Sequence, residues 1–346
     1  MRSGPPKSEA PRLPGELALL AQIRRRSARG SAKALRSGDL RLGIGDDCAL
    51  LRLRSGEELA VTTDLSIAGR HFQLDWHPPE AIGHRTLARG LSDLAAMGAR
   101  PIAAFLSLGL PRELPGQWLE RFIDGFLALA EAHNTPLAGG DLAESPVPLA
   151  DILLTGAVRR GKALLRSGAR PGDLLYVTGK LGGAAAGLAT LESLEGAAPR
   201  HKETWRPKIP AKLKDQLAPH LYPQSRIAQG LWLSRHFAAT AAIDLSDGLS
   251  TDLAHLCDES GVAAEIDAAA LPVHPAAALT QALHGGEDYE LLFTARRSAR
   301  LPRSIAGIAV TSIGRILHRR AGRPPVALLT ARGSEPLKPQ GWEHFS

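Results

Sequence analysis

The chain has 346 residues, which is long enough for two domains of ordinary size, and 44% of them are hydrophobic, as in a typical globular protein. Its apolar stretches end well before the roughly 20 residues that a membrane span needs. The net charge of +7 permits anionic partners, but aromatic residues make up only 4% of the chain, which is poor for stacking on bases. We therefore expect a cytoplasmic protein that binds neither nucleic acid nor membrane. The two cysteines, Cys48 and Cys257, suit a reducing compartment.

The first half of the chain alternates segments typical of helices and strands. Residues 1–14 carry four prolines and few apolar residues, so we expect a disordered extension there. Prolines open the longest predicted helix of this half, and Gly98 closes it. The predicted helices cover Glu16–Ala28, Pro79–Met97 and Gly116–His133, and the predicted strands cover Cys48–Leu53, Leu59–Thr63, Ile102–Leu108 and Asp151–Val158. Cys48 is interpreted as a small buried residue of its strand.

The second half repeats this alternation. Its predicted strands are Leu174–Val177, Ala241–Ile243, Glu265–Ile266, Tyr289–Thr294 and Ile308–Ile313, and its predicted helices are Gly182–Leu188, Ile227–His236 and Leu249–Glu259. Residues 195–225 are predicted to be a loop or an insertion. Strands that alternate with helices favour an α/β (α+β) fold. We divide the chain into residues 1–14, 15–158 and 159–346, with the boundary in the basic segment Arg159–Gly172.

Short Asp-rich segments are the strongest functional signal in the sequence. Each places Asp beside Gly, Ser or Thr, close to an apolar run: Gly43–Asp47, Thr62–Asp64, Leu91–Asp93, Gly139–Asp141 and Asp244–Gly248. Any one of them could simply close a turn or cap a helix. If the carboxylates converge, each pair about 4 Å apart costs roughly 4 kcal/mol at an effective dielectric of about 20. Mg²⁺, which prefers oxygen ligands, is the natural counter-charge.

Other common catalytic patterns are missing from the sequence. We find no G-x-x-x-x-G-K-[ST] phosphate loop, no G-x-G-x-x-G after a strand and no H-E-x-x-H. Carboxylates, hydroxyls and glycine turns remain, and these are the equipment of metal-assisted phosphate chemistry.

Together these segments resemble the thiamine-monophosphate kinase family over almost the whole chain, from about Gly15 to Phe345. The resemblance rests on Gly43–Leu51, Thr62–Phe72, Leu91–Gly98, Gly139–Asp141, Arg166–Asp173, Tyr176–Gly179, Ile243–Leu249 and Gly285–Leu291. It implies a two-domain fold like that of aminoimidazole ribonucleotide synthetase. In such a fold the N-terminal sheet forms the interface of a homodimer, the C-terminal domain is α/β, and the active site lies between the halves.

The resemblance also implies a reaction and a set of site residues. ATP, as co-substrate, phosphorylates thiamine monophosphate by direct in-line transfer with several Mg²⁺ ions, and no side chain is needed as a catalytic base because the accepting phosphate oxygen is already ionised. The implied metal ligands are Asp47, Thr62, Thr63, Asp64, Asp93, Asp141, Asp244 and Asp247. The implied nucleotide contacts are Gly140, Asp141, Arg166 and Ser246, and the implied contacts to thiamine monophosphate are His71, Glu287 and Trp342.

Three alternatives stay open at this point. The same carboxylates could serve a metal-dependent phosphohydrolase that uses water as the acceptor. The chain could be another ATP-using member of the same superfamily. A basic nucleic-acid-binding module is the third alternative, and the salt dependence of binding would reveal it.

Overall fold

The structure is a computed structural model that describes residues 15–194, 209–322 and 324–341. The expected disordered extension at residues 1–14 and the implied substrate contact Trp342 lie outside the described residues. No helix in the described part of the chain is both long enough and apolar enough to cross a membrane.

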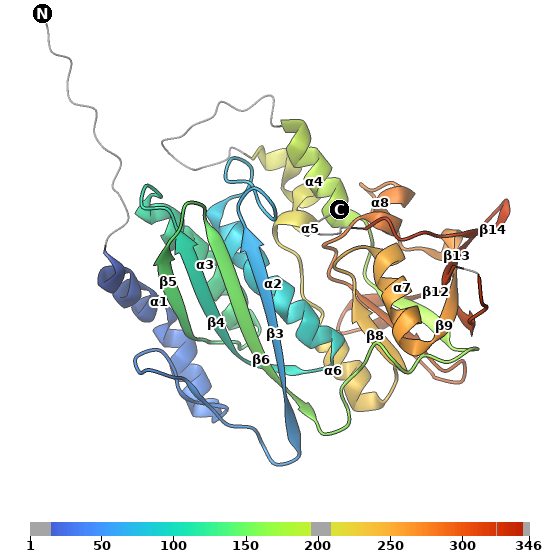
Figure 1. Cartoon of the computed structure of the whole chain (residues 1–346), viewed down its shortest axis with the longest axis horizontal. Coiled ribbons are helices and arrows are strands. Elements are labelled where there is room, and N and C mark those ends of the chain that lie inside the picture. Colours follow the sequence, from blue (N-terminus) through green and yellow to red (C-terminus); the bar gives the residue numbers. More distant parts are fainter. Residues whose placement is uncertain (1–14, 195–208, 323, 342–346) are drawn as a thin grey trace, which may run out of the picture.

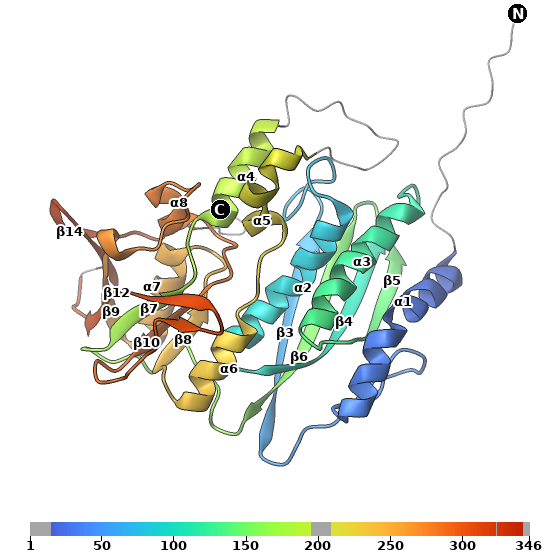
Figure 2. The same cartoon turned by 180° about the vertical axis from the view of Figure 1, so that it is seen from behind.

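The first half is built on a four-stranded sheet. Its strand order is β3 (Glu57–Ile67), β6 (Leu149–Arg159), β4 (Arg100–Leu110) and β5 (Leu137–Glu144), and of the neighbouring strands only β4 and β5 pair in parallel. Helices α2 (Pro79–Ala96) and α3 (Gly116–Ala132) cover one face of this sheet, as Figures 1 and 2 show from opposite sides. Helix α1 (Glu16–Ser37) lies beside β5, and β1 (Leu40–Leu42) pairs with β2 (Leu50–Leu51).

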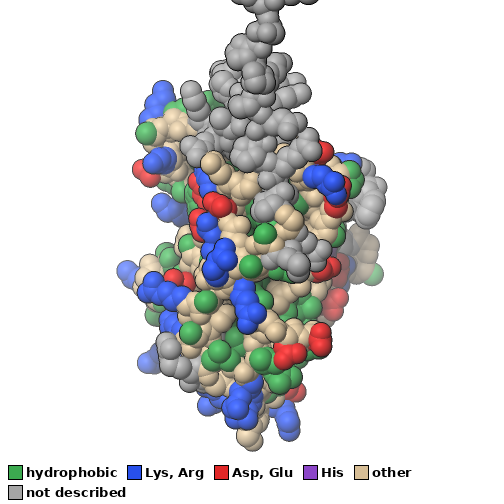
Figure 3. All heavy atoms as spheres, turned by 90° about the vertical axis from the view of Figure 1, so that its left-hand side faces the viewer, with side chains coloured by type: hydrophobic (Ala, Val, Ile, Leu, Met, Phe, Trp, Pro, Cys, Tyr) green, Lys and Arg blue, Asp and Glu red, His purple; other side chains and the backbone are tan. Residues whose placement is uncertain are grey.

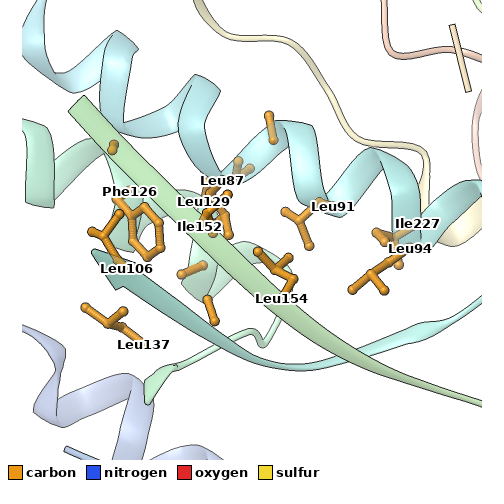
Figure 4. Packing of buried hydrophobic residues seen from close by; sticks show 14 of the residues in the cluster. Leu87, Leu91, Leu94, Leu106, Phe126, Leu129, Leu137, Ile152, Leu154 and Ile227 are labelled. Carbon is orange, nitrogen blue, oxygen red and sulfur yellow. The ribbon is translucent and has the colours of Figure 1, made fainter. Parts of the chain in front are cut away.

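The core between this sheet and its helices explains why α2 forms where the sequence predicts it. Leu87, Leu91 and Leu94 recur every three or four residues, so they fall on one face of the helix. In Figure 4 this face meets Ile152 and Leu154 of β6, and all five side chains are buried. The helix is thus held by apolar packing along most of its length.

The second half is a mixed sheet with helices around it. The strand order is β14-β13-β9-β12-β7-β10-β8, with β11 beside β12, and only β9 and β13 pair in parallel. The strands are β7 (Leu174–Thr178), β8 (Ala241–Asp244), β9 (Val262–Asp267), β10 (Leu291–Ala295), β11 (Ser304–Ile305), β12 (Ile308–His318), β13 (Val326–Thr330) and β14 (Gly333–Pro336). The helices are α4 (Gly183–Leu194), α5 (Lys214–Leu221), α6 (Ile227–His236), α7 (Leu249–Ser260) and α8 (Leu279–His284), with short 3₁₀ turns at Ala211–Leu213 and Ala268–Ala270.

Helix α2 also joins the two halves. Besides packing on the first sheet, it contacts α5, α6 and β8 of the second half. The main hydrophobic cluster accordingly runs across the boundary and includes Leu233, Ala242 and Phe293 with the leucines of α2. This arrangement brings the end of α2 close to the end of β8, where two of the Asp-rich segments lie.

Two expectations about individual elements are wrong. The predicted strand Cys48–Leu53 is reduced to Leu50–Leu51, which pairs with β1 and not with the following strand, and Cys48 is exposed outside any strand. Part of the predicted loop 195–225 is helix α5, which contains Pro219. Leu217 and Leu221 of α5 are buried, so tertiary packing outweighs the helix-breaking tendency of proline.

Candidate active site

A cavity of about 650 Å³ opens between the two halves of the molecule. Its walls come from the loop before α2, from α2 itself, from the start of α4, from the segment after β8 and from the turn before β10. Four aspartates form one group in this lining, which we call the carboxylate end. Aromatic, imidazole and apolar side chains form a second group, which we call the other end.

The carboxylate end holds Asp64, Asp93, Asp244 and Asp247. Burial raises the pKa of Asp64 to about 6, partly offset by Arg89, whose Nη2 lies 3.3 Å from Asp64 Oδ1. Burial and the neighbouring Asp244 carboxylate raise the pKa of Asp93 to about 6 as well. The pKa of Asp244 is raised mainly by its own burial. These acids therefore lie in a region that disfavours negative charge until a cation arrives.

Hydroxyl groups hold two of these carboxylates in place. Thr62 on β3 donates a hydrogen bond through Oγ1 to Asp93 on α2. Ser92 donates through Oγ to Asp244 Oδ2 at 2.7 Å, and both of these residues are buried. The adjacent positions Ser92 and Asp93 thus connect α2 to strands of both halves.

The donor chemistry at this end fits a hard divalent cation. All of the groups are oxygen donors, and buried carboxylates with raised pKa values gain free energy when a cation neutralises them. As the side chains stand, no three His, Cys, Asp or Glu side chains of the described residues are close enough together to enclose an ion. The carboxylates would have to turn toward one another around a metal.

Asp252, which sequence reasoning missed, supports the loop that carries Asp247. Its Oδ2 accepts hydrogen bonds from the backbone N–H groups of Asp247 at 3.1 Å and Gly248 at 3.0 Å, and the side chain is buried in α7. Burial, with the charge of Asp244, raises its pKa well above the usual value. An acidic residue in the first turn of a predicted helix was the available signal.

The cavity lining also contains His71 and Glu287, two of the implied substrate contacts. Glu287 and Tyr289 both have positive φ values, of 67° and 50°, which non-glycine residues rarely adopt. Their backbone N–H groups donate to Ser246 O at 2.8 Å and Leu245 O at 2.9 Å. This pairing holds the strained turn against the segment that bears Ser246.

Trp76 is an aromatic residue of this end that sequence reasoning missed. It lines the cavity from the loop before α2 and packs on a small cluster that includes Leu191 and Leu217. Trp342 lies outside the described residues, but Gly341 lines the same cavity and donates its backbone N–H to Thr251 Oγ1 at 3.0 Å.

A second cavity, of about 760 Å³, lies between α1, the loop after β1 and strands β4 and β5. Its walls are mostly apolar, and Asp46, Asp47 and Asp141 line it as well. Gly140 has a φ of 151°, and a Cβ there would stand 1.8 Å from Leu106 O, so only glycine fits this close approach of β5 to β4.

The structure divides the implied site residues into groups. Asp64, Asp93, Asp244, Ser246 and Asp247 share the first cavity with His71 and Glu287, while Asp47, Gly140 and Asp141 share the second. Thr62 and Asp64 alternate with Thr63 along β3, so Thr63 points to the opposite, open face of the sheet. Arg166 is exposed, but its positive charge offsets part of the rise in the pKa of both Asp93 and Asp244 that burial causes.

The simple alternative for two of the motifs is wrong. Asp141 and Asp244 could have been helix caps, but both lie within strands, β5 and β8. The N-cap residue of α7, the helix that follows Asp244, is Gly248, which has no side chain to cap this helix with a hydrogen bond.

Comparisons with known proteins agree with this architecture. Residues 45–158 match the family model described as AIR synthase related protein, N-terminal domain, and residues 170–314 match the model of the C-terminal domain. Two such halves with a cavity between them define an AIR synthase related protein, and the expected fold is confirmed.

The more specific family follows from individual relatives. Thiamine-monophosphate kinase of Escherichia coli K12 is 41% identical over 323 residues, which cover 89% of this chain and 93% of that protein. The crystal structure of thiamine-monophosphate kinase from Stenotrophomonas maltophilia is 38% identical, covers 92% of this chain and 98% of that chain, and superposes with a TM-score of 0.75. A structure of AaThiL complexed with AMPPCP and TMP is 30% identical, covers 96% of this chain and 97% of that chain, and has a TM-score of 0.72. The chain belongs to the thiamine-monophosphate kinase family.

Proposed function

We propose that this protein transfers the terminal phosphoryl group of ATP to thiamine monophosphate, giving ADP and thiamine diphosphate. The observation that carries the proposal is the first cavity, whose lining combines four aspartates with His71, Glu287 and aromatic side chains. The family to which the chain belongs supports the same activity, and so does the relative that was solved with an ATP analogue and TMP.

In this proposal the two ends of the cavity have different tasks. His71, Trp76 and Glu287 bind and orient the thiamine monophosphate, with Trp342 as a further proposed contact. Asp64, Asp93, Asp244 and Asp247, with Thr62 behind Asp93, hold Mg²⁺ near the reacting phosphates. The bound ions supply positive charge that offsets the repulsion between the two polyanions. Ser246 and Arg166 lie close to the same carboxylates and are proposed to contact the phosphates of ATP.

Gly140 on β5 and the second cavity are also proposed to contact the nucleotide. Apolar walls beside Asp47 and Asp141 suit a flat base attached to a phosphate chain with bound cations. Asp47, Thr63 and Asp141 remain proposed metal ligands, although they lie apart from the four acids of the first cavity in the single chain.

A catalytic base is not part of the proposal. The attacking oxygen belongs to a phosphate that is already ionised near neutral pH, so positioning and charge neutralisation account for catalysis. The buried histidines of the cavity agree with this, because burial lowers the pKa of His77 to about 3 and that of His220 well below its usual value.

We also propose that the first half forms a homodimer through the open face of its sheet. Strand β3 is an edge strand, and Leu59, Val61 and Leu65 on that face are each about half exposed, at 50%, 53% and 45%. An apolar row on an edge strand is typical of an interaction surface.

We also propose that the boundary between the two domains lies at residue 158, at the end of the first half.

A direct assay tests the proposed function. ADP formation is measured with ATP and Mg²⁺, with and without thiamine monophosphate, and thiamine diphosphate is quantified in parallel. We expect ADP and thiamine diphosphate in equal amounts and only when thiamine monophosphate is present. Phosphate release from ATP without an acceptor, and without thiamine diphosphate, would instead identify a phosphohydrolase.

A further inference from the structure

Glu287 does not stand alone in the wall of the first cavity, because Arg85 on α2 holds it. Arg85 Nη2 lies 2.6 Å from Glu287 Oε1, and the arginine side chain is only 7% exposed. The same Nη2 lies 3.5 Å from the carbonyl oxygen of His71. One buried guanidinium therefore contacts two of the residues that are proposed to bind the acceptor, His71 and Glu287.

Two buried histidines complete the cluster. Arg85 Nη1 donates to the carbonyl oxygen of His220 on α5 and lies 3.2 Å from His220 Nδ1. The other carboxylate oxygen of Glu287, Oε2, lies 3.5 Å from the same Nδ1. The Nε2 atoms of His220 and His77 are 2.9 Å apart, and His77 Nδ1 lies 3.1 Å from the carbonyl oxygen of Gln73. With Arg85 as donor, we assign His220 as the acceptor at Nδ1 and the donor at Nε2, and His77 then donates to Gln73.

The charges in this cluster have a consequence for recognition. Burial and the Arg85 guanidinium lower the pKa values of both histidines, so the imidazoles are neutral at physiological pH. Burial alone would raise the pKa of Glu287, but Arg85 and its hydrogen bond outweigh burial and lower it. Glu287 is therefore ionised, and its charge is already balanced by Arg85. Little of that charge is left to offset a cationic ligand.

The cluster also joins segments far apart in the sequence. His77 belongs to the loop before α2, Arg85 to α2, His220 to α5 and Glu287 to the turn before β10. The loop and α2 belong to the first half, whereas α5 and the turn belong to the second. The relative position of the two acceptor walls thus depends on these buried contacts.

We propose that Arg85 is a positioning residue for the acceptor, acting through Glu287. Supported by the neutral pair His77–His220, it presents the remaining oxygen of a charge-balanced carboxylate, which recognises a neutral N–H donor such as an amino group on a flat heterocycle. The cationic ring of the acceptor is then recognised by groups other than Glu287. This inference rests on the proposed function.

Steady-state kinetics of Arg85→Met and Arg85→Lys test the proposal. We expect Arg85→Met to raise the KM for thiamine monophosphate at least tenfold, while the KM for ATP and the kcat at saturating acceptor change less than threefold. Arg85→Lys keeps the charge but cannot reach Glu287 and His220 together, so we expect an intermediate rise. Arg121→Met is the matched control, since it breaks a part-buried arginine–glutamate pair, with Glu80, that lies outside both cavities.

A double-mutant cycle separates positioning from general stability. If Arg85 acts through Glu287, the Arg85→Lys change should alter kcat/KM for the acceptor much less in a Glu287→Gln background than in the wild type. The proposal would be overturned if the effects of the two substitutions on kcat/KM simply multiplied in the double variant. Equal rises in the KM for thiamine monophosphate and the KM for ATP would overturn it as well. If Arg85→Met does not fold, the double-mutant cycle with Arg85→Lys and Glu287→Gln still tests whether Arg85 acts through Glu287. Wild-type protein that does not phosphorylate thiamine monophosphate would refute the proposed function itself, independently of these comparisons.

Discussion

Trp76 shows what single residues contribute to the cavity. Its indole lines the end proposed for the acceptor, where it can stack on a flat ring or face a cationic one. We expect Trp76→Ala to raise the KM for thiamine monophosphate about 2- to 30-fold, the range that cation–π energies allow, with little change in the KM for ATP.

Two variants control for the packing role of Trp76. Trp76→Phe keeps an aromatic face and should recover most of the affinity. Trp232→Ala removes an indole that stacks on His236 in α6, outside both cavities, and should leave both KM values unchanged. An unchanged acceptor KM in Trp76→Ala would mean that the indole serves only the cluster around Leu191 and Leu217.

Asp93 links residue chemistry to stability. Its pKa is about 6 in the folded protein, against 3.8 for an unperturbed carboxyl, so ionisation is harder in the folded state. The wild type should therefore lose stability as the pH rises from about 4 through about 6. Asp93→Asn removes this loss, so in metal-free buffer we expect a gain of about 1–3 kcal/mol at pH 7.5 that disappears near pH 4.

Unfolding in urea with EDTA, at pH 7.5 and pH 4.5, measures this difference. Asp258→Asn is the control, because that carboxylate is exposed and pairs with Arg319 at 2.7 Å. A gain of the same size at both pH values would contradict the explanation. Turnover with Mg²⁺ should be lost in Asp93→Asn, since the carboxylate is a proposed metal ligand.

At the scale of elements, α3 packs closely against the start of α2, the helix that carries Asp93. A Cβ at Gly125 of α3 would stand 1.9 Å from the carbonyl oxygen of Glu80 in α2. We expect Gly125→Ala to cost about 1–3 kcal/mol, because the helices must separate. Gly30→Ala in α1 is the matched control, with nothing within 4 Å of its Cβ, and should gain up to about 1 kcal/mol. Thermal unfolding compares the two, and an unaltered Tm in Gly125→Ala would show that the helices can adjust freely.

The bounds of individual helices and strands show how much of the fold could be predicted from the sequence. Helices α2, α3 and α6 follow their apolar periodicity and end within about a residue of the predicted bounds. The strand at Cys48–Leu53 fails because an apolar run does not reveal a pairing partner. Side chains of a strand alternate between the two faces of its sheet, so the sequence of β3 alone indicates that Thr63 faces away from Thr62 and Asp64.

Long-range contacts were beyond such reasoning. Arg85 and His220 are separated by 135 positions, and Arg85 and Glu287 by 202, so nothing local in the sequence indicates their hydrogen bonds. Most carboxylates of the site were recognisable because Asp beside Gly, Ser or Thr is locally unusual. The roles of the residues that orient them could not be read in the same way, because the bond of Ser92 to Asp244 spans 152 positions and Asp252 acts on the backbone of the preceding loop.

At the scale of the whole molecule, the distribution of surface charge on one face bears on the choice between small anionic substrates and a polyanion. On the side that carries α1 and β5, basic side chains are spread over the height of the molecule, with acidic and hydrophobic ones between them (Figure 3). A nucleic-acid-binding protein would concentrate its positive charge along one track.

The open face of the first sheet leads to the last prediction. Leu59, Val61 and Leu65 lie on one face of the edge strand β3, and Val61 is the middle residue of this row. A charge placed there would have to be buried without a partner if two copies meet across this face, which costs several kcal/mol. We therefore expect the wild type to sediment as a dimer at micromolar concentration and Val61→Asp to sediment as a monomer with an unchanged far-UV spectrum. Leu329→Asp, on an exposed leucine of β13 in the second half, should remain a dimer. A monomeric wild type, or a Val61→Asp variant that still dimerises, would place the exposed apolar row outside any interface between copies.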